Sequence, residues 1–257
     1  MQKIIDLKKQ TNLLIDELKR VCADAGLGND GNEYKIITEI FLYKFINDKF
    51  IYELKKIDKK LSKETNPEKY LANLSKENYD ILMIRLNENV ARLKPNQFIS
   101  NIFNKQDERD FSKIFDDNLI SIAKDNDNIF SQLTSGGKKI PIFESISQYI
   151  RDNPNEFCKA IVNKLINFSF EKFFEKDQKF DFYATIFEYL IKDYNSNSGG
   201  TDYAEYFTPH SVAKIMATCL NTKKAKNVTC YDPASGSGTL LMNIANSIGD
   251  ENCTIFS

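Results

Sequence analysis

A short strand, a glycine-containing loop and a helix follow one another directly near residue 235, and this succession constrains the fold more than any other feature. Residues 227–231 combine β-branched and aromatic side chains, as a short buried strand does, and Asp232-Pro-Ala-Ser-Gly-Ser-Gly-Thr239 follows at once. Apolar residues then recur at helical spacing: Leu240, Leu241, Ile244 and Ala245. A strand that enters a helix through such a loop begins a βαβ unit of the nucleotide-binding kind.

The loop is chemically suited to a ligand. Gly236 and Gly238 let the backbone approach a ligand without Cβ clashes. The following helix offers free N–H groups and the positive end of its dipole. Asp232, at the carboxyl end of the strand, can accept hydrogen bonds from a ribose or an amine. A tight turn without a ligand is the alternative reading of the two glycines.

The spacing within the loop separates cofactor classes. A dinucleotide loop carries GxGxxG, but Leu241 occupies the third glycine position, and no Lys follows Gly238 as a P-loop requires. An acid four residues before GxG is instead similar to the S-adenosylmethionine loop of methyltransferases.

A second motif, Tyr206-Phe-Thr-Pro209, lies about twenty residues upstream. Thr208 as a cap and Pro209 at the first helical position predict a helix start. The residues Val212, Ile215, Met216 and Leu220 are expected to line its apolar face. The aromatic pair Tyr206 and Phe207 can sandwich a cofactor's adenine or methionine portion, or act as a hydrophobic staple on the helix. For His210, a surface or capping role is favoured.

Together the two motifs resemble the modification (M) subunit of type I restriction-modification enzymes, which are adenine-N6 DNA methyltransferases. The resemblance implies S-adenosyl-L-methionine as cofactor. It implies that the stretch around the first motif folds over the cofactor, namely Glu205, Tyr206, Phe207, Thr208, Pro209 and His210. It also implies that the glycine loop contacts the cofactor through Asp232, Gly236, Ser237, Gly238 and Thr239. It also implies DNA, a specificity (S) subunit, a restriction (R) subunit and a second M subunit as partners.

Residues 1–195 predict helices, in keeping with the helical N-terminal domain of that family. Gly26 and Gly28 end the first helix, and the second carries a broad apolar surface over residues 36–46 that predicts a buried central helix. Further helices are expected near Pro67 and over residues 79–86, 98–103, 110–123, 143–150, 154–170 and 180–194. Residues 135–141 predict a hairpin tip or loop, and the polar stretch 195–200 predicts a linker. The expected domains are residues 1–178 and 179–257.

Composition excludes several other classes. With 35 basic and 36 acidic residues among 257, the chain is not a globally basic nucleic-acid binder, although a local basic face remains open. Five Cys without CxxC and a single His argue against a metal site and for reduced thiols in a cytoplasmic protein. No stretch approaches the ~18 apolar residues of a membrane span, and the N-terminus lacks a signal peptide's apolar region. The lysine-rich run 55–63 favours a solvated face over DNA contact.

One expected motif is missing. The methyl-transfer site of such enzymes resembles Asn/Asp-Pro-Pro-aromatic, and this sequence contains no Pro-Pro pair, so no catalytic residue is predicted. Residues 253–257 resemble the beginning of a second strand, and residues 227–257 cannot cover both faces of a parallel sheet. The expectation is therefore an inactive N-terminal fragment of a DNA methyltransferase subunit. Its fold would be mainly α, with a helical domain before the start of an α/β Rossmann-like domain that is truncated after its first βα unit. The alternative is a helical DNA- or subunit-binding module without independent catalysis.

Overall fold

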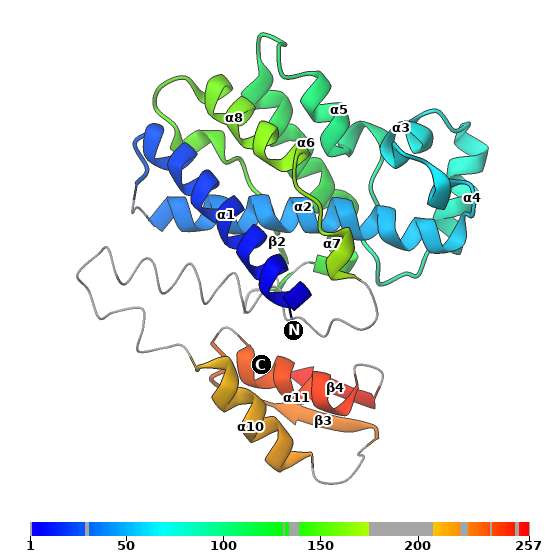
Figure 1. Cartoon of the computed structure of the whole chain (residues 1–257), viewed down its shortest axis with the longest axis vertical. Coiled ribbons are helices and arrows are strands. Elements are labelled where there is room, and N and C mark those ends of the chain that lie inside the picture. Colours follow the sequence, from blue (N-terminus) through cyan, green and yellow to red (C-terminus); the bar gives the residue numbers. More distant parts are fainter. Residues whose placement is uncertain are drawn as a thin grey trace. The chain divides into compact units, whose positions relative to one another are not determined.

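The computed structural model describes residues 2–28, 31–130, 132–133, 139–174, 208–221, 226–236, 238–249 and 252–256. The chain divides into two compact units, Met1–Phe180 and Asp181–Ser257, and each is described by itself (Figure 1). The helix predicted over residues 180–194, the predicted linker 195–200, and the site candidates Glu205, Tyr206, Phe207 and Ser237 lie outside the described residues.

The first unit is built around α2 (Gly31–Ile57), a helix of 27 residues that runs along its length (Figure 1). The side chains of Ile36, Tyr43 and Phe50 on this helix are completely buried, which confirms the predicted central helix. The preceding helix α1 (Gln2–Asp24) ends where predicted, because Gly26 adopts a φ of 82° and the Leu27 N–H bonds back to the Cys22 carbonyl at 2.9 Å.

Short helices surround this centre. At one end of α2 lie η1 (Leu61–Lys63), α3 (Pro67–Ala72) and α4 (Lys76–Arg85). As predicted, Pro67 begins α3, and the Asn66 side chain caps it by accepting the Lys69 N–H at 3.0 Å. The chain continues through η2 (Pro95–Gln97), α5 (Ile99–Asn104), α6 (Phe111–Asp125), α7 (Asp127–Phe130), η3 (Ser147–Tyr149), α8 (Pro154–Ile166) and η4 (Glu171–Phe173). Strands β1 (Gln132–Leu133) and β2 (Lys139–Ile140) pair antiparallel, so β2 occupies part of the segment 135–141 that was predicted as a hairpin tip or loop.

Two predicted helices are wrong in extent. Residues 143–150 contain only the single 3₁₀ turn η3, and α8 stops at Ile166 instead of residue 170. The carboxylate of Asp116 accepts the N–H groups of Ile146 at 3.0 Å and Ser147 at 3.2 Å, so this backbone is satisfied by a side chain instead of by helical bonds. In the same way the N–H of Phe170 donates to Asp48 at 2.8 Å.

The second unit is a small α/β element. Helix α10 (His210–Leu220) precedes β3 (Val228–Tyr231), which leads through the glycine loop into α11 (Thr239–Ile248) and on to β4 (Cys253–Phe256). The two strands pair in parallel, from Val228 opposite Cys253 to Tyr231 opposite Phe256. The predicted strand, loop, helix and second strand are all present, and the mainly helical class with a small parallel sheet is confirmed. In the described part of the chain, no helix is long and apolar enough to cross a membrane.

Candidate functional site: the glycine loop and the start of α10

The loop after β3 is held by its own backbone. The Asp232 N–H donates to the Phe256 carbonyl at 3.1 Å, so the parallel ladder extends one residue beyond β3. Asp232 Oδ1 then accepts the Ala234 N–H at 3.0 Å, which makes an Asx turn at the carboxyl end of the strand. The half-buried Asp232 carboxylate therefore already shapes the loop through one of its two oxygens.

Both described glycines of the loop adopt conformations that favour glycine. Gly236 has a φ of 54° and Gly238 a φ of 73°. Among the described residues, a Cβ placed on either would meet no atom within 4 Å, so conformation and not crowding by these residues requires glycine. The Gly238 N–H donates to the Ser235 carbonyl at 2.8 Å, and Gly238 precedes the first residue of α11. The backbone of the loop consequently faces open space at the amino end of a helix.

The start of α10 differs by one residue from the prediction. Pro209 occupies the N-cap position with an extended backbone (ψ 135°), and its carbonyl accepts the N–H groups of Val212 and Ala213. The helix begins at His210, so Thr208 as cap and Pro209 at the first helical position are corrected. No side chain at the N-cap makes a capping hydrogen bond there.

The residues expected on the apolar face of α10 are not the residues that it buries. Ile215 and Leu220 are 64% and 73% exposed, and Val212 and Met216 are exposed as well. The buried positions are instead Ala213 and Ala217, which lie against α11 in the closely packed α10–α11 pair. Small side chains let two helices approach closely. The sequence pattern of α10 alone did not show which of its faces would pack against α11.

A polar contact joins the start of α10 to α11. The Asn243 amide nitrogen donates to the Thr239 carbonyl at 2.8 Å and lies 3.3 Å from His210 Nδ1. Asn243 and Thr239 are buried, and His210 is half-buried. His210 thus has a packing role between the helices, in addition to being a site candidate. Sequence reasoning missed Asn243, although a polar residue between the buried positions Leu241 and Ala245 was a visible signal.

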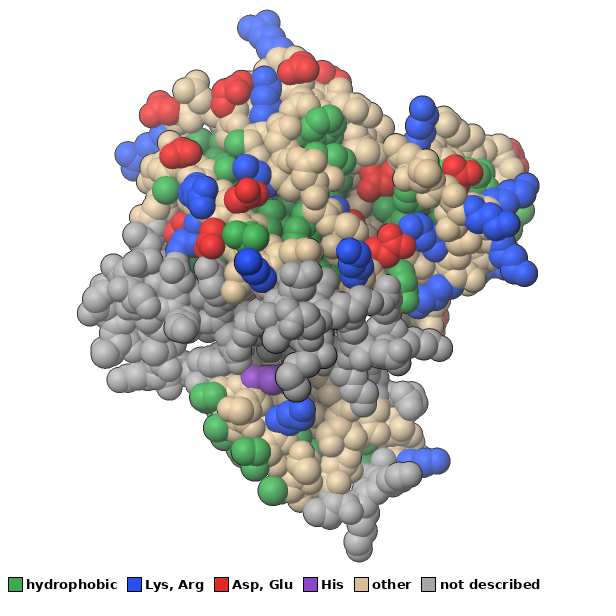
Figure 2. Space-filling view, viewed as in Figure 1, with side chains coloured by type: hydrophobic (Ala, Val, Ile, Leu, Met, Phe, Trp, Pro, Cys, Tyr) green, Lys and Arg blue, Asp and Glu red, His purple; other side chains and the backbone are tan. Residues whose placement is uncertain are grey.

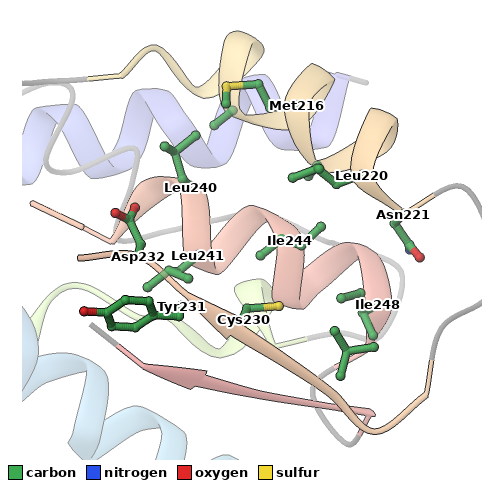
Figure 3. Close-up of a pocket in the computed structure, with 13 residues that line it drawn as sticks. Met216, Leu220, Asn221, Cys230, Tyr231, Asp232, Leu240, Leu241, Ile244 and Ile248 are labelled. Atoms are coloured by element: carbon green, nitrogen blue, oxygen red, sulfur yellow. The ribbon is translucent and has the colours of Figure 1, made fainter. Parts of the chain in front are cut away.

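A cavity of about 470 Å³ lies between α10, β3 and α11 (Figure 3). Asp232 lies at one end and Asn221 and Ile248 at the other, and apolar side chains such as Met216 and Leu240 line most of the space between. A cofactor with hydroxyl, amino and charged groups needs polar partners, but Asp232 and Asn221 lie at the two ends of this cavity and the space between them is lined mostly by apolar side chains. The cavity is therefore better explained as an uncovered stretch of apolar core than as the cofactor site itself.

The two strands carry further uncovered apolar surface. Tyr231 and Phe256 are register partners, and their side chains are 69% and 55% exposed. Within the described residues, nothing covers this pair. The expectation that residues 227–257 cannot cover both faces of a parallel sheet stays a prediction.

The described residues of the first unit show no second cluster of site chemistry. Lys55 pairs with Glu171 at 2.7 Å, and Lys56 pairs with Glu53 at 2.8 Å and lies 4.3 Å from the Tyr52 ring, which supports a structural role for these two lysines. Within the described residues, none of the five cysteines forms a disulfide. Among the residues that the structure describes, no three His, Cys, Asp or Glu side chains gather as a metal site would require. The assignment of the candidate residues to a cofactor remains a prediction.

Comparison with known proteins places this loop in a recognised class. The profile of the family N-6 DNA Methylase matches residues 178–256. The part of the chain that contains β3, the glycine loop and α11 is thus similar to N-6 DNA methylases.

The particular resemblance is to type I restriction systems. The type I restriction enzyme MpnII methylase subunit of Mycoplasma pneumoniae is 33% identical over 84 residues, which are 33% of this chain and 15% of that protein. The crystal structure of a type I restriction-modification system methyltransferase subunit from Streptococcus thermophilus matches 97% of this chain, with a TM-score of 0.66 and 16% identity. This chain spans 52% of the length of that solved relative. The resemblance predicted from the two motifs is confirmed, and the fold is similar to the matched part of that methyltransferase subunit.

Proposed function

We propose that this chain contributes the cofactor-binding beginning of a type I restriction-modification methyltransferase subunit that transfers a methyl group from S-adenosyl-L-methionine to adenine N6 in DNA. In this proposal residues 1–178 form the helical domain, and residues 179–257 begin a Rossmann-like catalytic domain. The observation that carries it is the loop of Asp232, Gly236 and Gly238 between a parallel strand and a helix, inside the segment that matches N-6 DNA methylases.

The residues present fit the cofactor. No atom of the described residues lies within 4 Å of a Cβ added to either positive-φ glycine, so these residues leave a ligand room to approach the backbone. The second carboxylate oxygen of Asp232 can accept a hydroxyl hydrogen bond while Oδ1 holds the Ala234 N–H. The amino end of α11 favours electron-rich groups of the ligand. S-adenosyl-L-methionine would supply the methyl group, and these residues of the chain would bind and orient it.

The chain itself is proposed to lack methyl transfer. The Asn/Asp-Pro-Pro-aromatic motif that would hold an extruded adenine is absent from the 257 residues. No arginine follows residue 151, so base readout by the second unit is disfavoured, and sequence recognition is assigned to a specificity subunit. By likeness to the relatives, we also propose that the chain works with a restriction subunit, a second M subunit and DNA. We propose a cytoplasmic location on the same ground.

Nuclear magnetic resonance titration tests the cofactor site. S-adenosyl-L-methionine added to the isotope-labelled chain should shift the backbone signals of Gly236, Gly238 and Thr239, with an affinity weaker than ~100 μM because much of the site is uncovered. Asp232→Ala should weaken the response about tenfold, and ATP should produce none at these residues. Absence of any shift at ~10 mM cofactor would refute the cofactor site.

The alternative, a DNA-binding helical module, has one observation in its favour. Figure 2 shows Lys and Arg side chains gathered over the α3–α4 end of the first unit. Within the described residues, the exposed side chains of Lys59, Lys60, Lys63, Lys69 and Lys76 make no ion pair there. If this surface binds duplex DNA, fluorescence anisotropy should show affinity that falls steeply with salt, and Lys60→Ala with Lys63→Ala should reduce the salt slope by about 2. Binding that these substitutions leave unchanged would reject this surface.

A further inference from the structure

Helices α10 and α11 are joined by a seam with a polar contact at each end. At one end lies the contact of His210 with Asn243, at 3.3 Å. At the other, the Asn221 amide nitrogen donates to the Ser247 carbonyl at 2.7 Å and to its hydroxyl at 3.0 Å. Between them Ala213 and Ala217 are almost completely buried. The contacts at both ends fix how far α10 can slide along α11.

The end at His210 is the one that meets the candidate site. His210 directly follows Thr208 and Pro209, and Asn243 bonds to the carbonyl of Thr239, which is the first residue of α11 after the glycine loop. Two motifs separated by more than twenty residues are therefore connected through one buried amide. The contact at Asn221 lies at the far end of both helices and has no such connection.

The orientation of the Asn243 amide indicates which ring nitrogen of His210 accepts a hydrogen bond. The Thr239 carbonyl can only accept, so the amide nitrogen of Asn243, and not its oxygen, must face it. The same nitrogen lies 3.3 Å from His210 Nδ1, and a hydrogen bond between them requires Nδ1 to accept, which puts the ring's N–H on Nε2.

From this geometry we infer that His210 and Asn243 are positioning residues that hold the Thr208–Pro209 stretch in register with the glycine loop for cofactor binding. The part of this inference that concerns cofactor binding rests on the proposed function. The structural part, a coupling between the start of α10 and the loop, can be measured without a cofactor.

Asn243→Ala and Asn221→Ala form a matched pair of variants, because each removes the same amide from one end of the same seam. With the labelled chain, Asn243→Ala should shift the backbone signals of Gly236, Gly238 and Thr239, whereas Asn221→Ala should leave them in place. The chain has a single His, so its ring signals are unambiguous, and they should report the Nε2–H form in the wild type and in Asn221→Ala. Equal effects of both variants on the loop, or an Nδ1–H ring in the wild type, would overturn the inference.

The cofactor titration adds the functional readout. Asn243→Ala should weaken S-adenosyl-L-methionine binding roughly tenfold, the effect of one lost hydrogen bond, and Asn221→Ala should change it less than about twofold. His210→Gln keeps an acceptor and should retain binding, whereas His210→Leu should not. If the wild type shows no response to the cofactor, the proposed function fails, and the loop signals of the two Asn variants still decide the coupling. A loss of folding in Asn243→Ala would be visible in its spectrum, and the His210→Gln and His210→Leu pair then provides the test.

Discussion

Glu39 shows how burial changes the chemistry of a single residue. It lies on the central helix α2, is only 8% exposed, and its Oε2 accepts the Glu144 N–H at 3.2 Å. Burial raises the pKa of this carboxyl from 4.5 to about 7; the positive charge of Lys35 opposes the shift, and the negative charge of Asp116 adds to it. The residue therefore titrates near neutral pH although it is an ordinary glutamate in the sequence.

The pH dependence of stability follows from this shift. Because the folded pKa lies above the unfolded value, the folded state holds the proton more tightly, and the stabilisation is complete below pH 4.5 and is lost as the pH rises through about 7. The free energy of unfolding of the wild type relative to Glu39→Gln should fall by up to about 3 kcal/mol between pH 4.5 and 8. Urea unfolding at the two pH values measures this difference. A difference that does not vary with pH would contradict the assignment.

The loop glycines give a second prediction for single residues. Gly236→Ala and Gly238→Ala should each destabilise the second unit by about 1–2 kcal/mol, since both positions have positive φ and no clash adds to the strain. Gly31→Ala is the control, because a Cβ there meets nothing within 4 Å and its φ is not positive. Hydrogen exchange of the α11 amides measures the loss, and unchanged protection in both loop variants would argue against strain at these positions.

At the scale of elements, α2 is both an apolar centre and a set of polar anchors for connecting segments. Asp48 accepts the Phe170 N–H at 2.8 Å and pairs with Lys44 at 3.0 Å. Asn47 accepts the Ile99 N–H at 3.2 Å and donates to Glu68 at 2.8 Å. Segments far apart in the sequence are thus held by buried side chains of one helix.

Breaking one anchor should be costly. Asp48→Ala leaves the Lys44 charge and the Phe170 N–H without their partner in the interior, so the loss of stability should be about 3–5 kcal/mol. Lys159→Ala, which removes a more exposed pair with Glu156 at 3.0 Å, should cost less than about 1 kcal/mol. Urea unfolding of the two variants compares them, and similar costs would show that Asp48 is not an essential anchor.

Sequence signals within a few residues predicted most helices and strands, but they did not predict which distant side chains those segments contact. Gly26, Pro67 and Pro154 fix helix ends through bonds and clashes within a few residues, so these ends were predictable. The apolar spacing of Phe143, Ile146 and Ile150 predicted a helix, but the Asp116 carboxylate on a distant helix takes the backbone N–H groups of that segment.

In the candidate site, too, the local structure was predictable from the sequence and the contacts between helices were not. The glycine loop and its helix follow from adjacent residues and were predicted. The buried face of α10 and the role of Asn243 depend on how two helices meet, which no periodicity within one helix contains.

At the scale of the whole molecule, the two units have unequal cores. The first unit buries many large side chains, including Phe41, Tyr43, Phe50 and Phe115. In the described part of the second unit the buried residues are few and most have small or polar side chains. They are Ala213, Ala217, Thr239, Leu241, Asn243 and Ala245. Since burial of apolar area drives folding, the described helices and strands of the second unit should be less stable than those of the first unit.

Hydrogen exchange in increasing urea should therefore show two separate transitions. Amides of α11 should lose protection at lower urea than amides of α2, because their opening exposes far less apolar surface. Mass spectrometry of the corresponding peptides distinguishes the two helices. Simultaneous loss of protection in both would show that the units unfold together.

The division at Phe180 also has a consequence for biosynthesis. Protein chains emerge from the ribosome amino end first, and domains generally fold as they appear. All internal contacts of the first unit lie within Met1–Phe180, so it can complete its fold while later residues are still being translated. The nascent second unit, with the apolar faces of α10 and of its strands uncovered, would then be the part of the newborn chain that chaperones bind.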